Sequence, residues 1–314
     1  NAGGRKAHNR TIFLREAEMN GYKRFVTGVV LLSVFTGVFA RGACAAQKEI
    51  KVVASFYPVY IMARNVIKDV PGVSLENLTP PFTGCLHDYA LTAADLKKLA
   101  GAQALIVNGA GMESFLEEVA ARHPGLRIIG VSEGISLIKS GDEANPHIWV
   151  GISGAVKQVK NLGAAMQSLD PAHKEFYAQN TADYAAKLDS LRKQMHAQLS
   201  SYKGRKIITF HEAFPYFAEE FGLEIAAVVE REPGSEPSAK ELAETIDLIK
   251  NSGGDGCVLF SEPQYPSSAA ETIAAETGLK VYVLDPAVSG PDEDGAYFKI
   301  MEKNLEVLKN AFRK

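Results

Sequence analysis

Short runs of β-branched and apolar residues alternate with helical stretches twice along the chain, and this pattern constrains the fold most strongly. The first four runs are IKVVA at 50–54, VSLENL at 73–78, ALIV at 104–107 and RIIGV at 127–131. The second four are KIITF at 206–210, IAAVV at 225–229, CVLF at 257–260 and VYVL at 281–284. Strands that alternate with helices form parallel sheets with helices on their faces. The pattern predicts an α/β protein with two parallel-sheet lobes.

One long helix is expected between the two sets of runs, because no Gly or Pro occurs between Pro171 and Gly204. Its apolar positions are Tyr177, Tyr184, Leu188, Leu191, Met195 and Leu199. Their spacing places them on one helical stripe. A helix of this extent would be on the order of 45 Å long, enough to run beside both lobes. We therefore expect an N-terminal lobe at 46–152, connecting helices at 153–203 and a C-terminal lobe at 204–314.

The segment 1–45 is expected to be a signal peptide with an upstream extension, outside the fold. An uncharged apolar run at 25–40 follows two basic residues and precedes small residues, which is the order of regions in a secretory signal. A membrane anchor, the alternative, needs about 20 apolar residues. Cleavage after Ala45 would leave a periplasmic or other extracytoplasmic protein. A lipid anchor on Cys44 is a second alternative, which Arg41 disfavours.

The charge of the remaining chain excludes some partners. The whole sequence has a net charge of −3, but 1–45 holds seven Lys and Arg against two Asp and Glu, so the rest carries −8. An acidic body without a run of basic residues disfavours binding to nucleic acid. Its two cysteines, Cys85 and Cys257, fall in different halves, and their spacing predicts no disulfide. We expect two free or buried thiols.

Four metal-ligating side chains stand where open α/β sheets bind ligands, at the carboxyl ends of strands. His87 follows the second run, His211 follows the fifth and Asp285 follows the eighth, while His147 precedes the helical stretch after the fourth. Two of these residues come from each half, so they can meet only in the cleft between the lobes. Three imidazoles and one carboxylate suit tetrahedral zinc.

Other polar residues have plainer interpretations. Four histidines away from strand ends are expected to be solvated: His8, His123, His173 and His196. Two pairs are spaced as helix caps: Thr92 with Asp95, and Ser238 with Glu241. Cys85 is expected to pack near the site without binding metal, because four ligands are available without it.

The sequence after His211 does not complete a metalloprotease motif. That motif, H-E-x-x-H, places two zinc ligands and a general base on one helical face. Glu212 occupies the position of the base, but Pro215 stands where the second histidine is required. We therefore expect Glu212 to orient an imidazole or to begin a helix, and we expect the protein not to be an enzyme.

Taken together, these segments resemble the metal-specific solute-binding proteins of zinc and manganese ATP-binding-cassette uptake systems. The resemblance covers about residues 48–314 and is carried by GCLHDYALTAADLKKL, ALIVNGAGMESFL, NPHIWVG, TFHEAFPYFAEEFGL, EPGSEPSAKELAETIDLIK and VYVLDP. It implies a two-lobed receptor with a long connecting helix. The family's four ligand positions fall on His87, His147, His211 and Asp285. Manganese-selective members typically carry Glu at the third position, so His211 favours Zn²⁺.

The resemblance further implies a monomeric receptor that binds one zinc ion and delivers it to a membrane permease. Many zinc members carry a long His-rich acidic loop before the second ligand, and this chain has only KSGDEANP at 139–146. The main alternative is a receptor for Mn²⁺ or iron on the same scaffold. Another is a zinc hydrolase in which water replaces Asp285 and Glu212 is the base. A third is a surface adhesin, for which the sequence offers no repeat or low-complexity segment.

Overall fold

The computed structural model describes residues 49–313, apart from Asp88, 141–142, 230–236, 252–255 and 265–266. The expected signal peptide, with His8 and Cys44, lies outside the described residues. The described chain falls in one compact unit, Glu49–Lys314. Within it, the described helices include none that is both long enough and apolar enough to cross a membrane.

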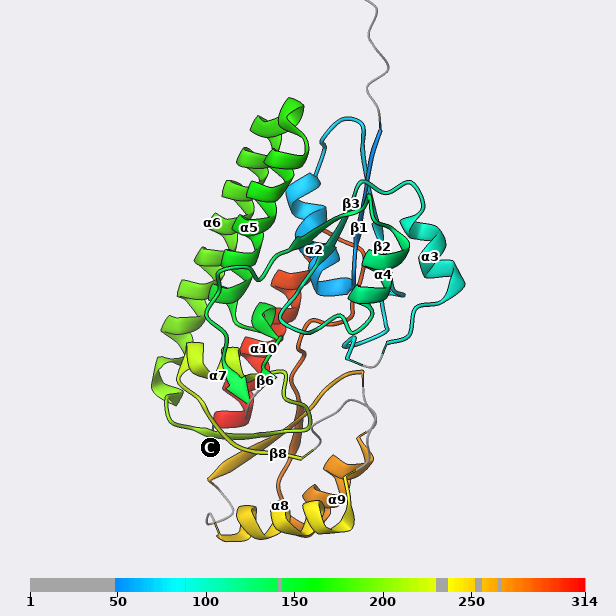
Figure 1. Ribbon diagram of the computed structural model, residues 1–314. Coiled ribbons are helices and arrows are strands. Elements are labelled where there is room, and N and C mark those ends of the chain that lie inside the picture. Colours follow the sequence, from blue (N-terminus) through cyan, green and yellow to red (C-terminus); the bar gives the residue numbers. More distant parts are fainter. Residues whose placement is uncertain are drawn as a thin grey trace, which may run out of the picture. The chain divides into compact units, whose positions relative to one another are not determined.

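The first half folds around a parallel sheet with the strand order β2-β1-β3-β4 (Figure 1). Its strands are β1 (Ile50–Ala54), β2 (Val73–Asn77), β3 (Ala104–Val107) and β4 (Arg127–Gly130). Its helices are α2 (Tyr57–Ile67), α3 (Ala93–Leu99) and α4 (Leu116–Arg122). All four residues of the central strand β3 are buried, as expected for a strand covered on both faces. The four predicted strands of this half are confirmed.

The second half contains a second parallel sheet with the order β10-β9-β7-β8. Its strands are β7 (Lys206–Thr209), β8 (Glu224–Val228), β9 (Cys257–Ser261) and β10 (Val281–Val283). Its helices are α7 (Pro215–Phe221), α8 (Ala239–Asn251), α9 (Ser268–Thr277) and α10 (Ala296–Phe312). Both halves are therefore of the predicted α/β class, while the predicted lobe boundaries stay a prediction.

Two long helices, α5 (Ile152–Leu169) and α6 (Lys174–Leu199), connect the halves and pack against each other (Figure 1). All six residues of the predicted apolar stripe on α6 are buried. At 1.5 Å per residue, α6 is about 39 Å long, shorter than expected because 3₁₀ turns at Pro171–His173 and Ser200–Tyr202 replace its first and last turns. It contacts α2 of the first half and α7 of the second, so it spans both.

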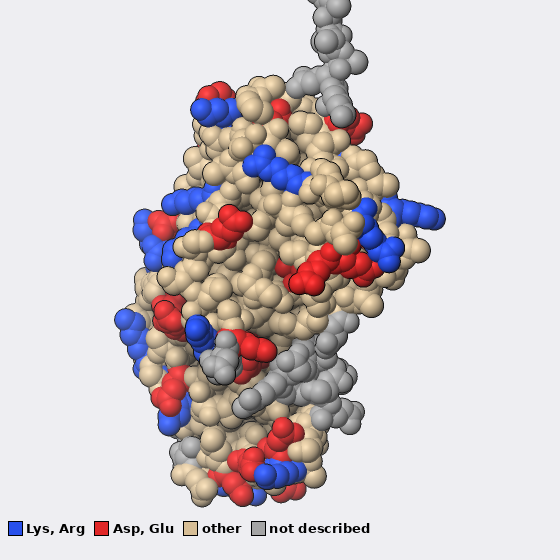
Figure 2. All heavy atoms as spheres, in the orientation of Figure 1, with Lys and Arg blue, Asp and Glu red and all other residues tan. Residues whose placement is uncertain are grey.

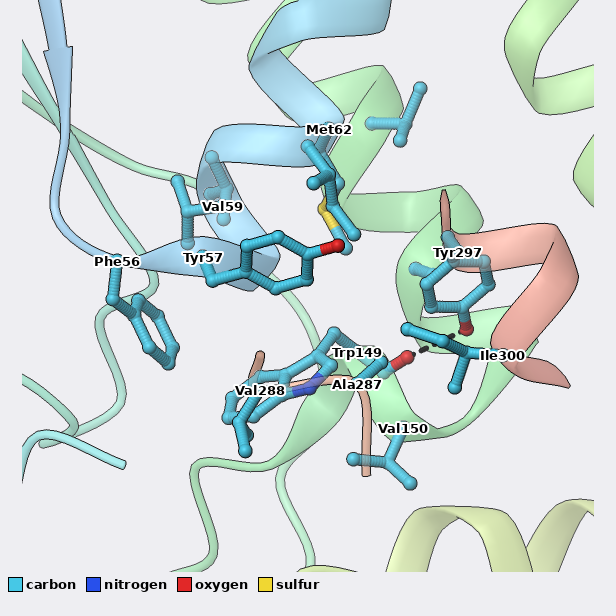
Figure 3. Packing of buried hydrophobic residues seen from close by; sticks show 14 of the residues in the cluster. Phe56, Tyr57, Val59, Met62, Trp149, Val150, Ala287, Val288, Tyr297 and Ile300 are labelled. Atoms are coloured by element: carbon cyan, nitrogen blue, oxygen red, sulfur yellow. Dashed lines mark hydrogen bonds between the residues drawn. The ribbon is translucent and has the colours of Figure 1, made fainter. Parts of the chain in front are cut away.

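The buried Trp149 ties the two halves together (Figure 3). Its indole Nε1 donates a hydrogen bond of 2.8 Å to the carbonyl of Pro286, and its own carbonyl accepts one of 2.7 Å from the Tyr297 hydroxyl. Its ring packs edge-on against Phe56, with the ring centres 5.2 Å apart. The chain after His147 is thereby fixed against the chain that follows β10.

Smaller features of the sequence also have their expected structure. Thr92 and Asp95 form a reciprocal capping box, and Ser238 and Glu241 exchange the same pair of hydrogen bonds. The segment around 139–146 contains a short hairpin, β5 (Lys139–Ser140) with β6 (Glu143–Ala144), that was not predicted. On the face shown in Figure 2, acidic and basic side chains are interspersed.

The close contact between α5 and α6 depends on Gly163. A Cβ atom at this position would lie 2.9 Å from Thr181 Cβ and closer still to Thr181 Oγ1. Gly163→Ala would normally stabilise a helix by about 1 kcal/mol. Here the overlap should instead lower the free energy of unfolding by about 1–3 kcal/mol, measured by urea denaturation. Gly125→Ala, whose Cβ would meet open space, is the control. A Gly163→Ala protein at least as stable as wild type would contradict the packing described.

Candidate metal centre

The structure brings three of the four sequence-predicted ligands together, along with one cysteine. One ligand atom from each of Cys85, His87, His147 and His211 can be chosen so that all four lie within 4.8 Å of one another. The ring centres are 4.7 Å apart for His147 and His211, 5.4 Å for His87 and His147, and 6.4 Å for His87 and His211. We refer to these four residues as the metal cluster.

The spacing of the imidazoles fits one tetrahedral metal ion. With Zn–N bonds of about 2.0–2.1 Å, three imidazoles on one zinc have ring centres roughly 5 Å apart. The three observed separations bracket that value. His87 is the most distant of the three rings.

His87 is positioned by a buried neighbour in the loop between β2 and α3. The side chain of Leu86 is fully buried, its N–H lies 3.5 Å from Met112 Sδ, and its carbonyl accepts a hydrogen bond of 3.4 Å from the Ser114 hydroxyl. Cys85 and His87, on either side of Leu86, are both partly exposed.

His147 is oriented by Asn145. The Asn145 amide donates through Nδ2 to the carbonyl of Glu212 at 2.8 Å, so its Oδ1 must face His147. That oxygen accepts from the His147 backbone N–H at 3.0 Å and lies 3.2 Å from the ring Nδ1. Nδ1 is therefore assigned as the protonated nitrogen, because it faces an acceptor. This leaves the lone pair of Nε2 directed toward the cluster, where a metal ion requires it.

His211 lies beside a buried carboxylate that the sequence analysis overlooked. Glu262 Oε2 is 3.5 Å from His211 Nδ1, and the Glu262 side chain is 1% exposed. A carboxylate behind a metal-binding imidazole fixes the ring and increases its basicity. Glu212 was expected to orient an imidazole or to begin a helix; α7 begins later, at Pro215, and the carboxylate beside His211 Nδ1 is that of Glu262. Glu262 directly follows β9, so the strand-end rule pointed to it as well as to the histidines.

Asp285, the predicted fourth ligand, lies outside the metal cluster. It follows β10 as expected, but its Oδ1 accepts a hydrogen bond of 2.8 Å from the Ala287 N–H. Its backbone is held by Asn304, which donates to the Asp285 carbonyl at 2.7 Å and accepts from its N–H at 2.9 Å. Burial raises the pKa of the Asp285 carboxyl above its ordinary value. As a metal ligand, Asp285 stays a prediction.

Cys85 lies near the site as expected, with its Sγ 3.4 Å from His147 Nε2, and it belongs to the metal cluster. One of the remaining expectations needs correction. His173 was expected to be solvated, but its side chain is 11% exposed and pairs with Asp170 at 2.6 Å. His123 and His196 are partly exposed. None of these three histidines belongs to the metal cluster found among the described residues. Cys85 and Cys257 form no disulfide with each other.

A cavity of about 620 Å³ gives access to the cluster. His87, His147 and His211 line it, together with the turn containing Ala110 and Gly111. This turn has left-handed backbone at Gly109, Ala110 and Gly111. The buried carboxylate of Glu113 holds its start, accepting hydrogen bonds from the N–H groups of Asn108 at 2.7 Å and Gly109 at 3.0 Å. Hydrogen bonds to Glu113 thus hold the backbone of the turn that forms this side of the cavity.

Comparison with known proteins identifies relatives named for zinc uptake and zinc binding. A family model described as "Zinc-uptake complex component A periplasmic" matches residues 52–311. The "High-affinity zinc uptake system protein ZnuA" of Bacillus subtilis is 30% identical over 84% of this chain and 88% of its own length. The "Zinc-binding lipoprotein AdcA" of Streptococcus pneumoniae is 29% identical over 85% of this chain, which spans 57% of AdcA.

Solved structures share the fold. The solute-binding protein FpvC of Pseudomonas aeruginosa, solved in complex with Ni²⁺, superposes with a TM-score of 0.76 at 32% identity, covering 84% of this chain and 97% of FpvC. FpvC has also been solved with Mn²⁺. Because the family model matches most of the chain, the match identifies the family as well as the fold.

The buried position of His147 leads to a prediction for the metal-free protein. Burial, and then the neighbouring His211 and His87, lower the pKa of His147 well below its ordinary value of 6.5. Below about pH 6.5, the unfolded chain therefore binds more protons than the folded protein does. The free energy of unfolding should then fall by up to about 1.4 kcal/mol for each pH unit of acidification.

His147→Gln removes this group, so the stability difference between wild type and His147→Gln should shrink or reverse sign as the pH falls. Urea denaturation with a chelator present, from about pH 8 to about pH 5, measures this difference. A difference that does not change across this interval would show that His147 titrates normally in the folded protein.

Proposed function

The chain belongs to the family of periplasmic zinc-uptake complex component A, and we propose that it binds one zinc ion outside the cytoplasm and delivers it to an ATP-binding-cassette permease. Members of this family are solute-binding receptors and not enzymes. The zinc hydrolase considered from the sequence is therefore set aside. The zinc ion is the transported cargo.

One observation carries the proposal: imidazoles from both halves of the chain converge within ligand distance of a common point. His87 and His147 come from the first half and His211 from the second, so a bound ion would join the two. Zn²⁺ accepts such nitrogen ligands readily, whereas Mn²⁺ prefers oxygen ligands. The proposal is supported by the names of the relatives, which are a zinc uptake protein and a zinc-binding lipoprotein.

The site is better suited to carriage than to catalysis. A catalytic zinc keeps one position open for water, whereas a site with four protein ligands is closed. The metal cluster offers three nitrogens and one sulfur, enough to close a tetrahedral site. A closed site protects the ion until a change in the spacing of its ligands weakens its binding.

A receptor for manganese is the alternative, since a relative with 32% identity has been solved with Mn²⁺. The donor set favours zinc. Competition between Zn²⁺ and Mn²⁺ at equal free concentration tests the choice, and tighter binding of Mn²⁺ would overturn it. The permease, the monomeric state and export by a cleaved signal peptide are parts of the same proposal, and lipid attachment is the alternative anchor.

The proposal predicts the effect of removing each imidazole. His87→Ala, His147→Ala and His211→Ala should each weaken zinc binding by at least about tenfold, that is by about 1.4 kcal/mol or more, because each removes one bond to the ion. Isothermal titration of metal-stripped protein with Zn²⁺ measures both affinity and stoichiometry, and wild type should bind one equivalent.

His123→Ala is the matched control, because His123 lies on the first half but outside the metal cluster. Its zinc affinity should equal that of wild type. Full affinity in His211→Ala, or a wild-type stoichiometry of zero or two, would contradict the proposed site.

A further inference from the structure

The position of Cys85 allows the fourth metal ligand to be named. We infer that Cys85 Sγ binds the metal ion together with His87, His147 and His211, so that the site is a three-nitrogen, one-sulfur centre for a borderline-soft divalent cation such as Zn²⁺. This inference rests on the proposed function and replaces Asp285 as the fourth ligand.

The distance between Cys85 and His147 is the first argument. Cys85 Sγ lies 3.4 Å from His147 Nε2. With Zn–S of about 2.3 Å and Zn–N of about 2.0–2.1 Å, a sulfur and a nitrogen on one tetrahedral zinc are roughly 3.6 Å apart. The two atoms therefore already have the separation that a shared zinc ion requires.

The protonation of His147 is the second argument. Because Asn145 Oδ1 faces Nδ1, the Nε2 atom carries a lone pair, and this is the atom that Cys85 approaches. The thiol can then donate its S–H to Nε2 across the 3.4 Å that separates the two atoms. A metal ion that binds both atoms takes the place of this proton, which passes to solvent as the thiol becomes a thiolate.

The local chain provides the third argument. Cys85 and His87 flank the buried Leu86, are both partly exposed, and place a ligand atom each in the metal cluster from one short segment. Two ligands from one short segment and one from each of two others form a compact tetrahedral set. Asp285, in contrast, uses its Oδ1 to accept from the Ala287 N–H and lies outside the cluster.

A thiolate makes the centre more selective for soft metals. Sulfur ligands favour Zn²⁺ and disfavour Mn²⁺, which prefers oxygen. Cys85 therefore strengthens the preference that the three imidazoles already give, and it compensates for the absence of a carboxylate from the cluster.

Cobalt provides a direct test, because thiolate-bound Co²⁺ has a charge-transfer band in the near ultraviolet, whereas tetrahedral Co²⁺ with any donors has bands in the visible. Metal-stripped full-length protein titrated with Co²⁺ should develop both, each reaching a plateau at one equivalent. Cys85→Ser should lose the ultraviolet band, keep the visible bands at one equivalent, and bind Zn²⁺ at least about tenfold more weakly.

Cys44→Ser and Cys257→Ser are matched controls, and both should keep the ultraviolet band. Asp285→Asn should keep it as well, with nearly unchanged zinc affinity. Cys85→Ala serves as a second variant in case the serine protein does not fold.

The outcomes separate the two proposals. Visible bands without an ultraviolet band in wild type would overturn the thiolate ligand and leave the receptor intact. The same conclusion follows if Cys85→Ser binds Zn²⁺ as tightly as wild type while Asp285→Asn loses binding. If wild type binds neither Co²⁺ nor Zn²⁺, both the receptor and its thiolate ligand are wrong.

Discussion

The hydrogen bonds of Asn145 connect the two loops on which the metal centre depends. The side chain donates to the carbonyl of Glu212, next to His211. Its oxygen accepts from the backbone N–H of His147 and from the protonated Nδ1 of the His147 ring. The Asn145 amide thus sets the tautomer of His147. It also holds the loop of His147 beside the loop of His211, which comes from the other half of the chain. The Tyr216 hydroxyl reinforces this junction by donating to the Asn145 carbonyl at 2.8 Å.

The fold makes this junction possible. Two parallel sheets direct the carboxyl ends of their strands toward the site, and α5 and α6 hold the sheets in one unit. Trp149 and Tyr297 add a second connection between the halves close to His147. Ligands from both halves can then bind one ion, and a small change in the spacing of the halves would alter the coordination. A transport receptor needs this coupling, because it must hold its cargo firmly and later release it.

Periodic features of the sequence predicted most of this architecture. The β-branched runs identified all eight strands of the two large sheets, and the apolar stripe from Tyr177 to Leu199 identified α6. The rule that ligands bind at strand ends selected His87, His147 and His211, which lie together. The rule also selected Asp285, which lies outside the cluster, because it predicts the edge of a sheet and not the direction of each side chain in the loop.

Cys85 was set aside as a ligand and Glu262 was missed, for different reasons. Cys85 lies in an irregular loop, where periodicity does not give the direction of a side chain, so its approach to His147 could not be predicted. Glu262 follows β9 directly, so the rule that found the histidines applied to it, but an acidic residue among many gave no sign that it faces His211. Contacts between loops therefore required the structure.

The central claim is that one zinc ion is bound between the two halves by His87, His147 and His211. A crystal structure of the zinc-loaded protein, with anomalous data collected at the zinc edge, tests it most directly. We expect one anomalous peak, with a nitrogen of each of the three imidazoles at about 2.0–2.1 Å from it. A peak bonded to fewer than three of these histidines, or one located elsewhere in the protein, would contradict the claim.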